Sequence, residues 1–427
     1  MPILDLLRQG WDALASVPYL RLYLTLGWAL YLLLLGGWII LQKREPVATV
    51  SWLLGLALLP YVGFLIYHVF GPQRIERQRL RRARVRGELP AQSLAENEDV
   101  AELARMVRSA TGLPMTTASS LRLLVDALGA ARCQRFFGSL VEAGGELAWF
   151  HPTRFGRIWQ RPWTNLRSHR KIVVIDGRVG YTGGMNVTDD QNERVNAAAY
   201  RDLHLRVEGN VVRALQLVFV EDWAYATGER DFIGDVVRQT PRLPAGGTCA
   251  QVITSGPDSP WEAIHRAHVG AIHAARERVW LVTPYFVPGE AAMMSLTSTV
   301  LAGLDVRLVV PRMSDSRLVT FAARSYFGPL LQAGVKVYEY GPRMLHTKAL
   351  LVDQSTVLIG SANFDHRSFR LNFEVSVLFE DAEMGAALAQ LIEGELASAP
   401  RVRPGRQRWL LTARLPEALA RLLSPVL

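Results

Sequence analysis

The stretch of sequence that decides the fold is written twice. Residues 169–186 read HRKIVVIDGRVGYTGGMN, and residues 346–363 read HTKALLVDQSTVLIGSAN. Both fit H-x-K-x4-D-x6-G-[GS]-x-N with the same internal spacing, which indicates an internal duplication. Two copies of one His, Lys, Asp and Asn set predict a single composite active site, in which one histidine attacks and the other donates a proton.

The segments around the two motifs also match each other. The matching pairs are 121–130 (LRLLVDALGA) with 306–315 (VRLVVPRMSD), 140–152 (LVEAGGELAWFHP) with 330–342 (LLQAGVKVYEYGP), and 202–209 (DLHLRVEG) with 373–380 (FEVSVLFE). These pairs predict an α/β fold of two repeats, each with strands and helices around a buried sheet. The second repeat also has an earlier helix, strand and helix over 261–304. By comparison of the repeats, roughly fifty matching residues are missing from the first.

Each motif predicts a polar pair on one face of a strand. Four apolar residues follow each lysine, which favours a buried strand. Because side chains alternate along a strand, His169 and Lys171 share a face, as do His346 and Lys348. Lysine supplies positive charge to phosphate oxygens, and histidine is suited to nucleophilic or acid–base work near neutral pH. We therefore expect a phosphate site.

The other motif positions have different expected roles. Asp176 and Asp353 lie seven positions past the motif histidines. That is the opposite strand face, so we expect them to stabilise a turn or the sheet rather than touch their own histidine. The small residues that follow let the backbone approach a ligand, and Asn186 and Asn363 could then donate to phosphate oxygens.

A catalytic histidine needs an acceptor on its second nitrogen. The candidates lie one strand later, Asp202 in the first repeat and Glu374 in the second. On spacing alone, these two residues could equally be surface carboxylates at the ends of strands.

The N-terminal part favours a membrane. Residues 22–41 form a run of 20 residues without charge, long enough to cross a bilayer, and a second uncharged run covers 46–71. We expect a transmembrane helical hairpin; a buried hairpin in a soluble core and a shallow re-entrant hairpin are the alternatives. Seven arginines over 74–86 place the following chain in the cytoplasm by the positive-inside rule.

Composition agrees with an anionic partner. The net charge is +9 and the isoelectric point about 9.8, which favours membrane phospholipid or nucleic acid.

Other features of the sequence are less specific. Two cysteines give neither a disulfide framework nor a Cys-based metal site, and the spacing of His265, His268 and His273 does not match a zinc helix. Arginines and aromatics alternate over 154–170, which suits lipid head groups, nucleic acid or a solvated loop. The amphipathic tail, 406–427, suits a membrane surface or packing on the domain.

These residues carry a family resemblance. The doubled motif resembles the phospholipase D superfamily. Segments 43–72, 283–288 (TPYFVP), GGMN, GSAN and 365–374 (DHRSFRLNFE) are similar to bacterial cardiolipin synthases, over nearly the whole chain. The resemblance implies two sequential phosphatidyl transfers that need no metal or other cofactor. His169 attacks one phosphatidylglycerol and releases glycerol. His346 protonates the leaving group, then deprotonates the hydroxyl of a second phosphatidylglycerol.

The resemblance also implies the remaining roles and the location. Lys171, Lys348, Asn186 and Asn363 would hold the phosphate, Asp202 and Glu374 would orient the histidines, and Asp176 and Asp353 complete the catalytic motif. The expected place is the bacterial inner membrane, multi-pass, with the catalytic part in the cytoplasm, and with phosphatidylglycerol and anionic lipids rather than nucleic acid as partners. The expected segments are a hairpin (1–72), a basic and polar linker (73–120), a shortened first repeat (121–250), a second repeat (251–400) and an amphipathic tail (401–427).

The chain departs from the family in its first repeat, where a helix, a strand and a further helix are expected before residue 121. Three alternatives to the synthase therefore stay open. They are a phospholipase D-type hydrolase, another phosphatidyl transferase, and a catalytically impaired lipid-binding paralogue. The sequence leaves the acceptor alcohol and the oligomeric state open.

Overall fold

The computed structural model describes residues 18–41, 50, 52–56, 121–130, 134–151, 166–229, 247–259, 261–405 and 409–424. The chain divides into two compact units, Met1–Gln73 and Arg74–Leu427. The arginine cluster, the linker, most of the second uncharged run and most of the arginine–aromatic segment lie outside the described residues.

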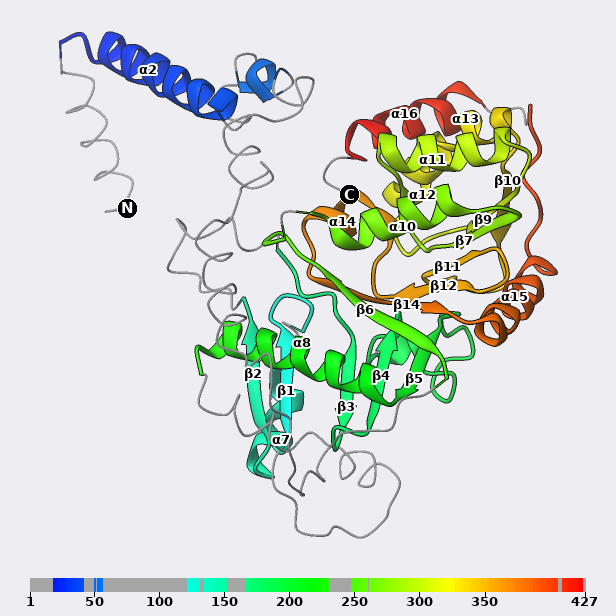
Figure 1. The fold of residues 1–427 in the computed structure, drawn as a ribbon. Helices are drawn as coiled ribbons and strands as arrows, with labels where there is room; N and C mark the ends of the chain where they lie inside the picture. The colour runs from blue at the N-terminus through cyan, green and yellow to red at the C-terminus, as the bar shows by residue number, and fades with distance from the viewer. Residues whose placement is uncertain are drawn as a thin grey trace. The chain divides into compact units, whose positions relative to one another are not determined.

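The first unit contains helix α2, Leu20–Leu41 (Figure 1). Ile39 of α2 is buried with Leu56, and Trp52 packs against them, so α2 pairs with the start of the second uncharged run. The other face of α2 exposes leucines, among them Leu30 and Leu33. Within the described ranges, no helix meets the length and apolarity needed to cross a bilayer.

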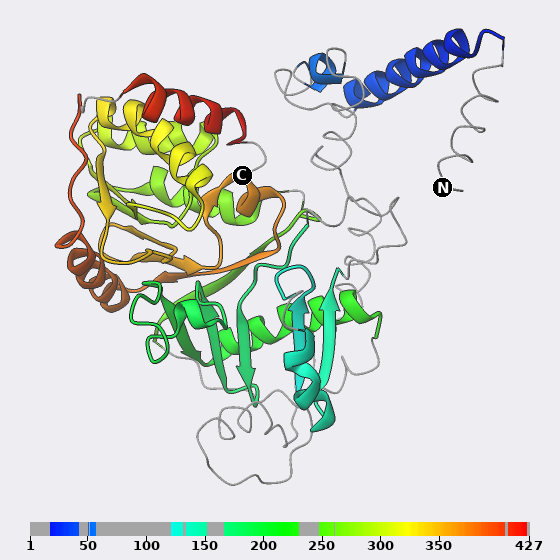
Figure 2. The same cartoon turned by 180° about the vertical axis from the view of Figure 1, so that it is seen from behind.

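The second repeat forms one mixed sheet of seven strands in the order β10-β9-β7-β11-β12-β14-β6 (Figures 1 and 2). Its strands are β6 (Cys249–Ser255), β7 (Arg278–Val282), β9 (Asp305–Pro311), β10 (Lys336–Tyr340), β11 (Ala349–Val352), β12 (Thr356–Gly360) and β14 (Glu374–Glu380). Strands β7, β9 and β10 run parallel, and β7 then pairs antiparallel with β11. Strand β7 is therefore the joint between a parallel and an antiparallel half.

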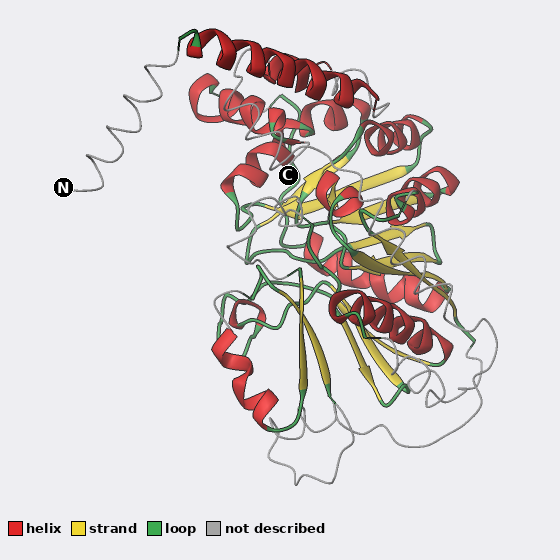
Figure 3. Ribbon diagram, turned by 90° about the vertical axis from the view of Figure 1, so that its left-hand side faces the viewer, coloured by secondary structure: helices red, strands yellow, loops and turns green. Residues whose placement is uncertain are grey.

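Helices cover both faces of this sheet (Figure 3). The helices of the second repeat are α10 (Ala263–Ala274), α11 (Glu290–Leu301), α12 (Arg317–Ser325), α13 (Phe327–Ala333), α14 (His366–Arg370) and α15 (Ala382–Leu396), and a short two-stranded sheet joins β8 (Phe286–Val287) to β13 (Phe364–Asp365). Side chains of α10, α11 and α13 pack on one face. The opposite face packs against α15 and against buried side chains of the first repeat, such as Val207 and Leu215. The two repeats therefore share one hydrophobic core.

The first repeat differs from the expected single buried sheet. Its described strands form two separate sheets, parallel β1-β2 and antiparallel β3-β4-β5. The elements are β1 (Arg122–Asp126), η1 (Gln134–Phe137), α7 (Gly138–Glu142), β2 (Glu146–Phe150), β3 (Ile172–Ile175), β4 (Val179–Gly183), η3 (Asp189–Gln191), β5 (His204–Glu208) and α8 (Asn210–Thr227). In the sequence match, β1 corresponds to β9 and β3 to β11. The segment missing from the first repeat therefore includes the counterpart of β7, the strand that joins the parallel and antiparallel halves of the large sheet.

The missing strand has a measurable consequence. All four residues of β11 are buried, whereas β3 is only half-buried and Val173 is 36% exposed. The prediction of a buried strand is thus confirmed for the second motif and wrong for the first, because β3 lacks a described neighbour on that side. Helix α8 packs against both small sheets and bridges the break between them.

Candidate active site

A crossed backbone connection brings the two motifs together. Ser168 forms a parallel bridge with Phe373, and Arg201 forms one with Leu345. The His169 N–H donates to the carbonyl of Phe373 (2.9 Å), and the His346 N–H donates to the carbonyl of Arg201 (2.6 Å). The residues after Phe373 and Arg201 are Glu374 and Asp202. Each motif histidine therefore lies beside the carboxylate of the opposite repeat.

The side chains follow this crossing. Nδ1 of His169 lies 2.9 and 3.0 Å from the two Glu374 oxygens, and Nδ1 of His346 lies 2.5 Å from Oδ2 of Asp202. Both carboxylates are buried, so the idea that they are surface groups at strand ends is wrong. Each one belongs to the histidine of the other repeat, so neither repeat holds a complete site by itself.

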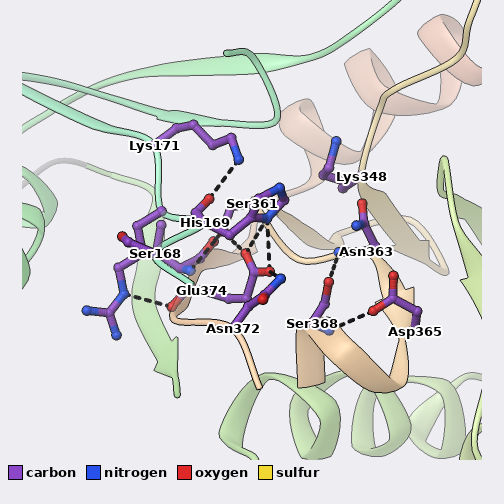
Figure 4. Close-up of polar contacts among 12 residues, drawn as sticks. Ser168, His169, Lys171, Lys348, Ser361, Asn363, Asp365, Ser368, Asn372 and Glu374 are labelled. Carbon is purple, nitrogen blue, oxygen red and sulfur yellow. Dashed lines mark hydrogen bonds and ion pairs between the residues drawn. The ribbon is translucent and has the colours of Figure 1, made fainter. Parts of the chain in front are cut away.

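Glu374 is fixed on several sides (Figure 4). Asn372 donates its side-chain N–H to Oε1 at 3.1 Å, and the Ser361 hydroxyl donates to Oε2. Burial opposes its negative charge, but His169, Lys171 and the Ser361 bond outweigh burial and hold the pKa of Glu374 below its ordinary value. The carboxylate is therefore ionised and held beside Nδ1 of His169.

The two motif lysines carry unusual electrostatics. Burial and the neighbouring Lys348 lower the pKa of Lys171 to about 7, because together they outweigh the nearby carboxylates. Burial lowers the pKa of Lys348 to about 8. The Lys348 ammonium lies 2.9 Å from Nδ1 and 3.3 Å from Nε2 of His346. Burial and this lysine lower the pKa of His346 to about 4. Burial also lowers the pKa of His169, against the opposing effect of Glu374. The site thus holds two neutral imidazoles beside two lysines whose charged forms an anion would stabilise.

A glycine shapes the pocket of Asp202. A Cβ added at Gly184 would lie 2.2 Å from Oδ1 and 2.8 Å from Cγ of Asp202. The matching residue of the second repeat is Ser361, whose hydroxyl donates to Glu374. The sequence difference GG against GS therefore sets how each carboxylate is held.

The motif aspartates lie in turns, one of the two places that the sequence left open. Asp176 and Asp353 each have a φ of 53° directly after β3 and β11. The Asp353 carboxylate accepts bonds at 2.8–3.1 Å from the backbone N–H groups of Arg276, Glu277 and Arg278. Burial opposes the charge, but these bonds lower the pKa of Asp353. The Asp353 carboxylate thus ties the β11–β12 turn to the start of β7. It lies away from the histidines.

The two asparagines are placed differently. Asn363 is buried, and its Oδ1 is among the buried side-chain atoms without a hydrogen-bond partner in the described part of the chain. Asn186 is exposed, and its backbone N–H donates to Oε1 of Gln191 at 2.5 Å. Gln191 in turn places Nε2 3.2 Å from Nδ1 of His346. The backbone of Asn186 is therefore linked to His346 through Gln191, which the motif comparison did not single out.

Two further residues escaped the sequence analysis. Arg170 is buried and bonds Asp222 of α8 at 2.6 and 2.7 Å, and it donates to the Glu374 carbonyl at 3.1 Å. It connects the helix that bridges the split sheets to the strand of the opposite repeat. His204 lies opposite Gly183 across the β4–β5 pair. Burial and, to a smaller extent, Lys171 lower the pKa of His204 against the opposing effect of Asp202. The sequence signals for Arg170 were its place between the motif His and Lys and its place at the end of the arginine–aromatic segment, and neither predicted this contact.

Two family models match parts of the chain. The family model described as "Cardiolipin synthase, PLD-like domain" matches residues 269–396, and the model described as "Phospholipase D-nuclease N-terminal" matches residues 28–72. The crystal structure of phosphatidylserine synthase from Haemophilus influenzae Rd KW20 covers 82% of this chain and 94% of its own, with a TM-score of 0.55 and 13% identity. That likeness concerns the fold alone.

Curated relatives are similar over most of the chain. Cardiolipin synthase 2 of Bacillus anthracis is 38% identical over 310 residues, which cover 72% of this chain and 60% of the relative. This chain thus spans about three-fifths of that relative's length. Cardiolipin synthase of Geobacillus thermodenitrificans is 31% identical over 455 aligned positions, 91% of this chain and 90% of the relative. Those positions outnumber the chain's 427 residues, so the relative carries segments that are missing here. With both motifs whole and this likeness along the chain, the protein belongs to the cardiolipin synthase family of the phospholipase D superfamily.

Proposed function

We propose that the protein is a phosphatidyl transferase that makes cardiolipin and glycerol from two phosphatidylglycerol molecules. One observation carries the proposal, the crossed pairing of each motif histidine with the buried carboxylate of the other repeat. A site assembled in this way offers two imidazoles with separate roles and two lysines for one phosphodiester.

His169 is the nucleophile in this proposal. Its side chain is 27% exposed, against 8% for His346, and Glu374 holds its Nδ1, so the lone pair on Nε2 is the one available for attack. Nε2 attacks the phosphorus of the first phosphatidylglycerol. The bond from phosphorus to the glycerol oxygen breaks, and His346 donates a proton to that oxygen. Glycerol leaves, and a phosphatidyl-histidine remains.

The second transfer reverses the proton's direction. His346, now neutral, takes the proton from a hydroxyl of the second phosphatidylglycerol. The oxygen attacks phosphorus, the bond to Nε2 of His169 breaks, and cardiolipin forms. In the empty site His346 has a pKa of about 4 and is neutral, so its imidazole has a free nitrogen lone pair, as a base step requires. A bound phosphodiester raises the pKa of Lys171, Lys348 and His346 by its negative charge, which prepares His346 for the earlier acid step.

The phosphate itself would lie between the two lysines. Lys171 and Lys348 supply the charge, and Asn363 supplies an amide next to Ser361 in the second motif. Asn186 contributes through Gln191 or after a local adjustment of its exposed segment. Asp176 and Asp353 serve the fold of the motifs in this account, and Asp202 and Glu374 position the histidines.

The proposed place of action is the cytoplasmic side of a bacterial inner membrane, with residues 1–72 as a membrane hairpin. The pairing of α2 with Leu56 and the exposed leucines of α2 support a hairpin that meets an apolar environment. The seven arginines that follow support the cytoplasmic side. Deletion of residues 1–72 should leave only weak, salt-sensitive membrane attachment; attachment that resists carbonate washing would contradict the hairpin as the main anchor.

The activity is tested with the purified protein, labelled phosphatidylglycerol and thin-layer chromatography of the products. We expect labelled cardiolipin and free glycerol. Phosphatidic acid as the main product would make the protein a hydrolase instead. The broken first sheet is the observation that favours a catalytically impaired lipid-binding protein, and that reading predicts lipid binding without any product.

A further inference from the structure

The C-terminal helix packs on the domain with its small and polar side chains and turns its leucines outward. Helix α16, Leu415–Leu422, packs on α12. The side chains it buries are Glu417, Ala420 and the following Ser424. In a helix on a water-soluble domain the leucines would face inward. Here the inward face is small or polar.

The leucines of this segment face outward. Leu415, Leu419 and Leu422 recur at helical spacing and are 44%, 54% and 76% exposed. The same is true of the turn before the helix and the residue after it. We name the whole set the C-terminal leucine face: Trp409, Leu410, Leu411, Leu415, Leu419, Leu422 and Leu423. So many large apolar side chains along 16 residues mark a surface that meets an apolar partner.

Specific contacts hold the helix in this orientation. The Tyr326 hydroxyl donates to Oγ of Ser424 at 3.0 Å, and the Arg421 guanidinium lies 4.5 Å over the Tyr326 ring and donates to the Ser325 carbonyl at 3.3 Å. These contacts place the polar side chains on the domain. Turning the helix to bury its leucines would break them all.

We propose that the C-terminal leucine face lies in the surface of an anionic bilayer and docks the catalytic part of the protein on its membrane. The charge of the segment supports this partner over a second protein. Between Trp409 and Ser424 the basic residues are Arg414 and Arg421, and the acidic residue is Glu417, which is buried. Arg414 is exposed, and Arg421 stays exposed beside its contact with Tyr326, so the charge at the edge of the leucine face is positive, as in helices that lie on anionic lipid. A tryptophan at the start of the segment suits the head-group region.

The inference rests on the membrane attachment proposed above, but not on the reaction. Docking at two places, the N-terminal unit and α16, would keep the catalytic part at the lipid surface. This matters for a substrate whose acyl chains stay in the bilayer while only its head group reaches the histidines.

The test uses the full chain with Cys133 and Cys249 replaced by serine, and one environment-sensitive fluorophore (NBD) attached at a new cysteine. The three positions are Leu419→Cys on α16, Leu391→Cys on α15 as the matched control, and Leu30→Cys on α2 as the attachment control. Leu391 is an exposed leucine, 40% exposed, and the exposed residues beside it on α15 include Gln390 and Glu393. Each labelled protein is reconstituted into phosphatidylglycerol vesicles with or without lipids that carry a nitroxide quencher.

We expect the probe at 419 to brighten several-fold in vesicles and to be quenched by the nitroxide lipids, as at 30, while the probe at 391 stays as in water. Equal behaviour at 419 and 391, with quenching at 30, would overturn the inference and leave the attachment and the activity standing. A bright probe at 419 that the lipids do not quench would mean a protein partner and would also overturn it. No quenching at either 30 or 419 would overturn both the docking and the attachment.

A second measurement does not depend on the probe. Leu419→Glu with Leu422→Glu should lower turnover of phosphatidylglycerol in vesicles but not of short-chain phosphatidylglycerol in detergent micelles. The control Leu391→Glu should change neither. An equal loss in vesicles and micelles would show damage to the domain and would contradict docking.

Discussion

Replacing Gly184 by alanine should damage the site through a single contact. The added Cβ would lie 2.2 Å from Oδ1 of Asp202, closer than any real Cβ contact. The atoms it meets are at the end of the Asp202 side chain, so the carboxylate should move rather than the backbone. Moving it by about 1 Å takes it off Nδ1 of His346, and misplacement of that size costs about 100-fold in kcat, or about 2.7 kcal/mol of transition-state stabilisation.

The assay is turnover of phosphatidylglycerol by a double-mutant cycle. Asp202→Ala removes the three atoms nearest to the new Cβ, so Gly184→Ala should add little in that background. Thermal unfolding of each variant shows whether the fold is kept. Two results would refute the reasoning. One is near-normal turnover by Gly184→Ala with Asp202 intact, and the other is the full penalty of Gly184→Ala on top of Asp202→Ala.

Three further predictions follow from the electrostatics and the split sheet. In the free enzyme, kcat/KM should fall as pH rises through about 7 and about 8, because deprotonation of Lys171 and Lys348 removes the positive charge that attracts the phosphodiester; a flat profile up to about pH 10 would contradict this. Asp353→Asn should lower the free energy of unfolding in urea by about 1–3 kcal/mol but keep most turnover of the folded protein, whereas a dead but stable variant would place Asp353 in the chemistry. Amide hydrogens of β1 and β3 should exchange faster than those of β7 and β11, and slower exchange over 121–190 than over 279–363 would show that the missing strand was never needed.

Much of the site could be predicted because its signal is local. The spacing of the doubled motif predicted one site for His169 and His346, and strand parity predicted that Asp353 stabilises a turn or the sheet rather than touching its own histidine. The pairing of histidines with carboxylates was not local. His169 and Glu374 are 205 positions apart, and only the bridges between repeats show that each carboxylate serves the opposite histidine. Strand parity describes one strand and carries no information about which strands meet.

The first repeat shows a second limit. The four residues after Lys171 are as apolar as those after Lys348, so both read as buried strands. Burial also depends on neighbours, and no strand of the described residues pairs with β3 on the side away from β4. The comparison of the repeats found a segment missing from the first repeat, but its consequence for the burial of β3 could be seen only from the strand order.

The C-terminal tail is a case in which the sequence left two interpretations open and both can hold. Its two interpretations, packing on the domain and lying on a membrane, are compatible, because α16 packs with its polar side and leaves its leucines outside.

The most direct test of the central claim is to find the covalent intermediate. The protein is mixed with phosphatidylglycerol labelled in the phosphatidyl part, quenched in acid at several short times, and digested for peptide mapping. The account predicts label on His169 without label from the released glycerol, and none in a His169→Ala protein. Label on His346, or no adduct at any time while cardiolipin is formed, would contradict it.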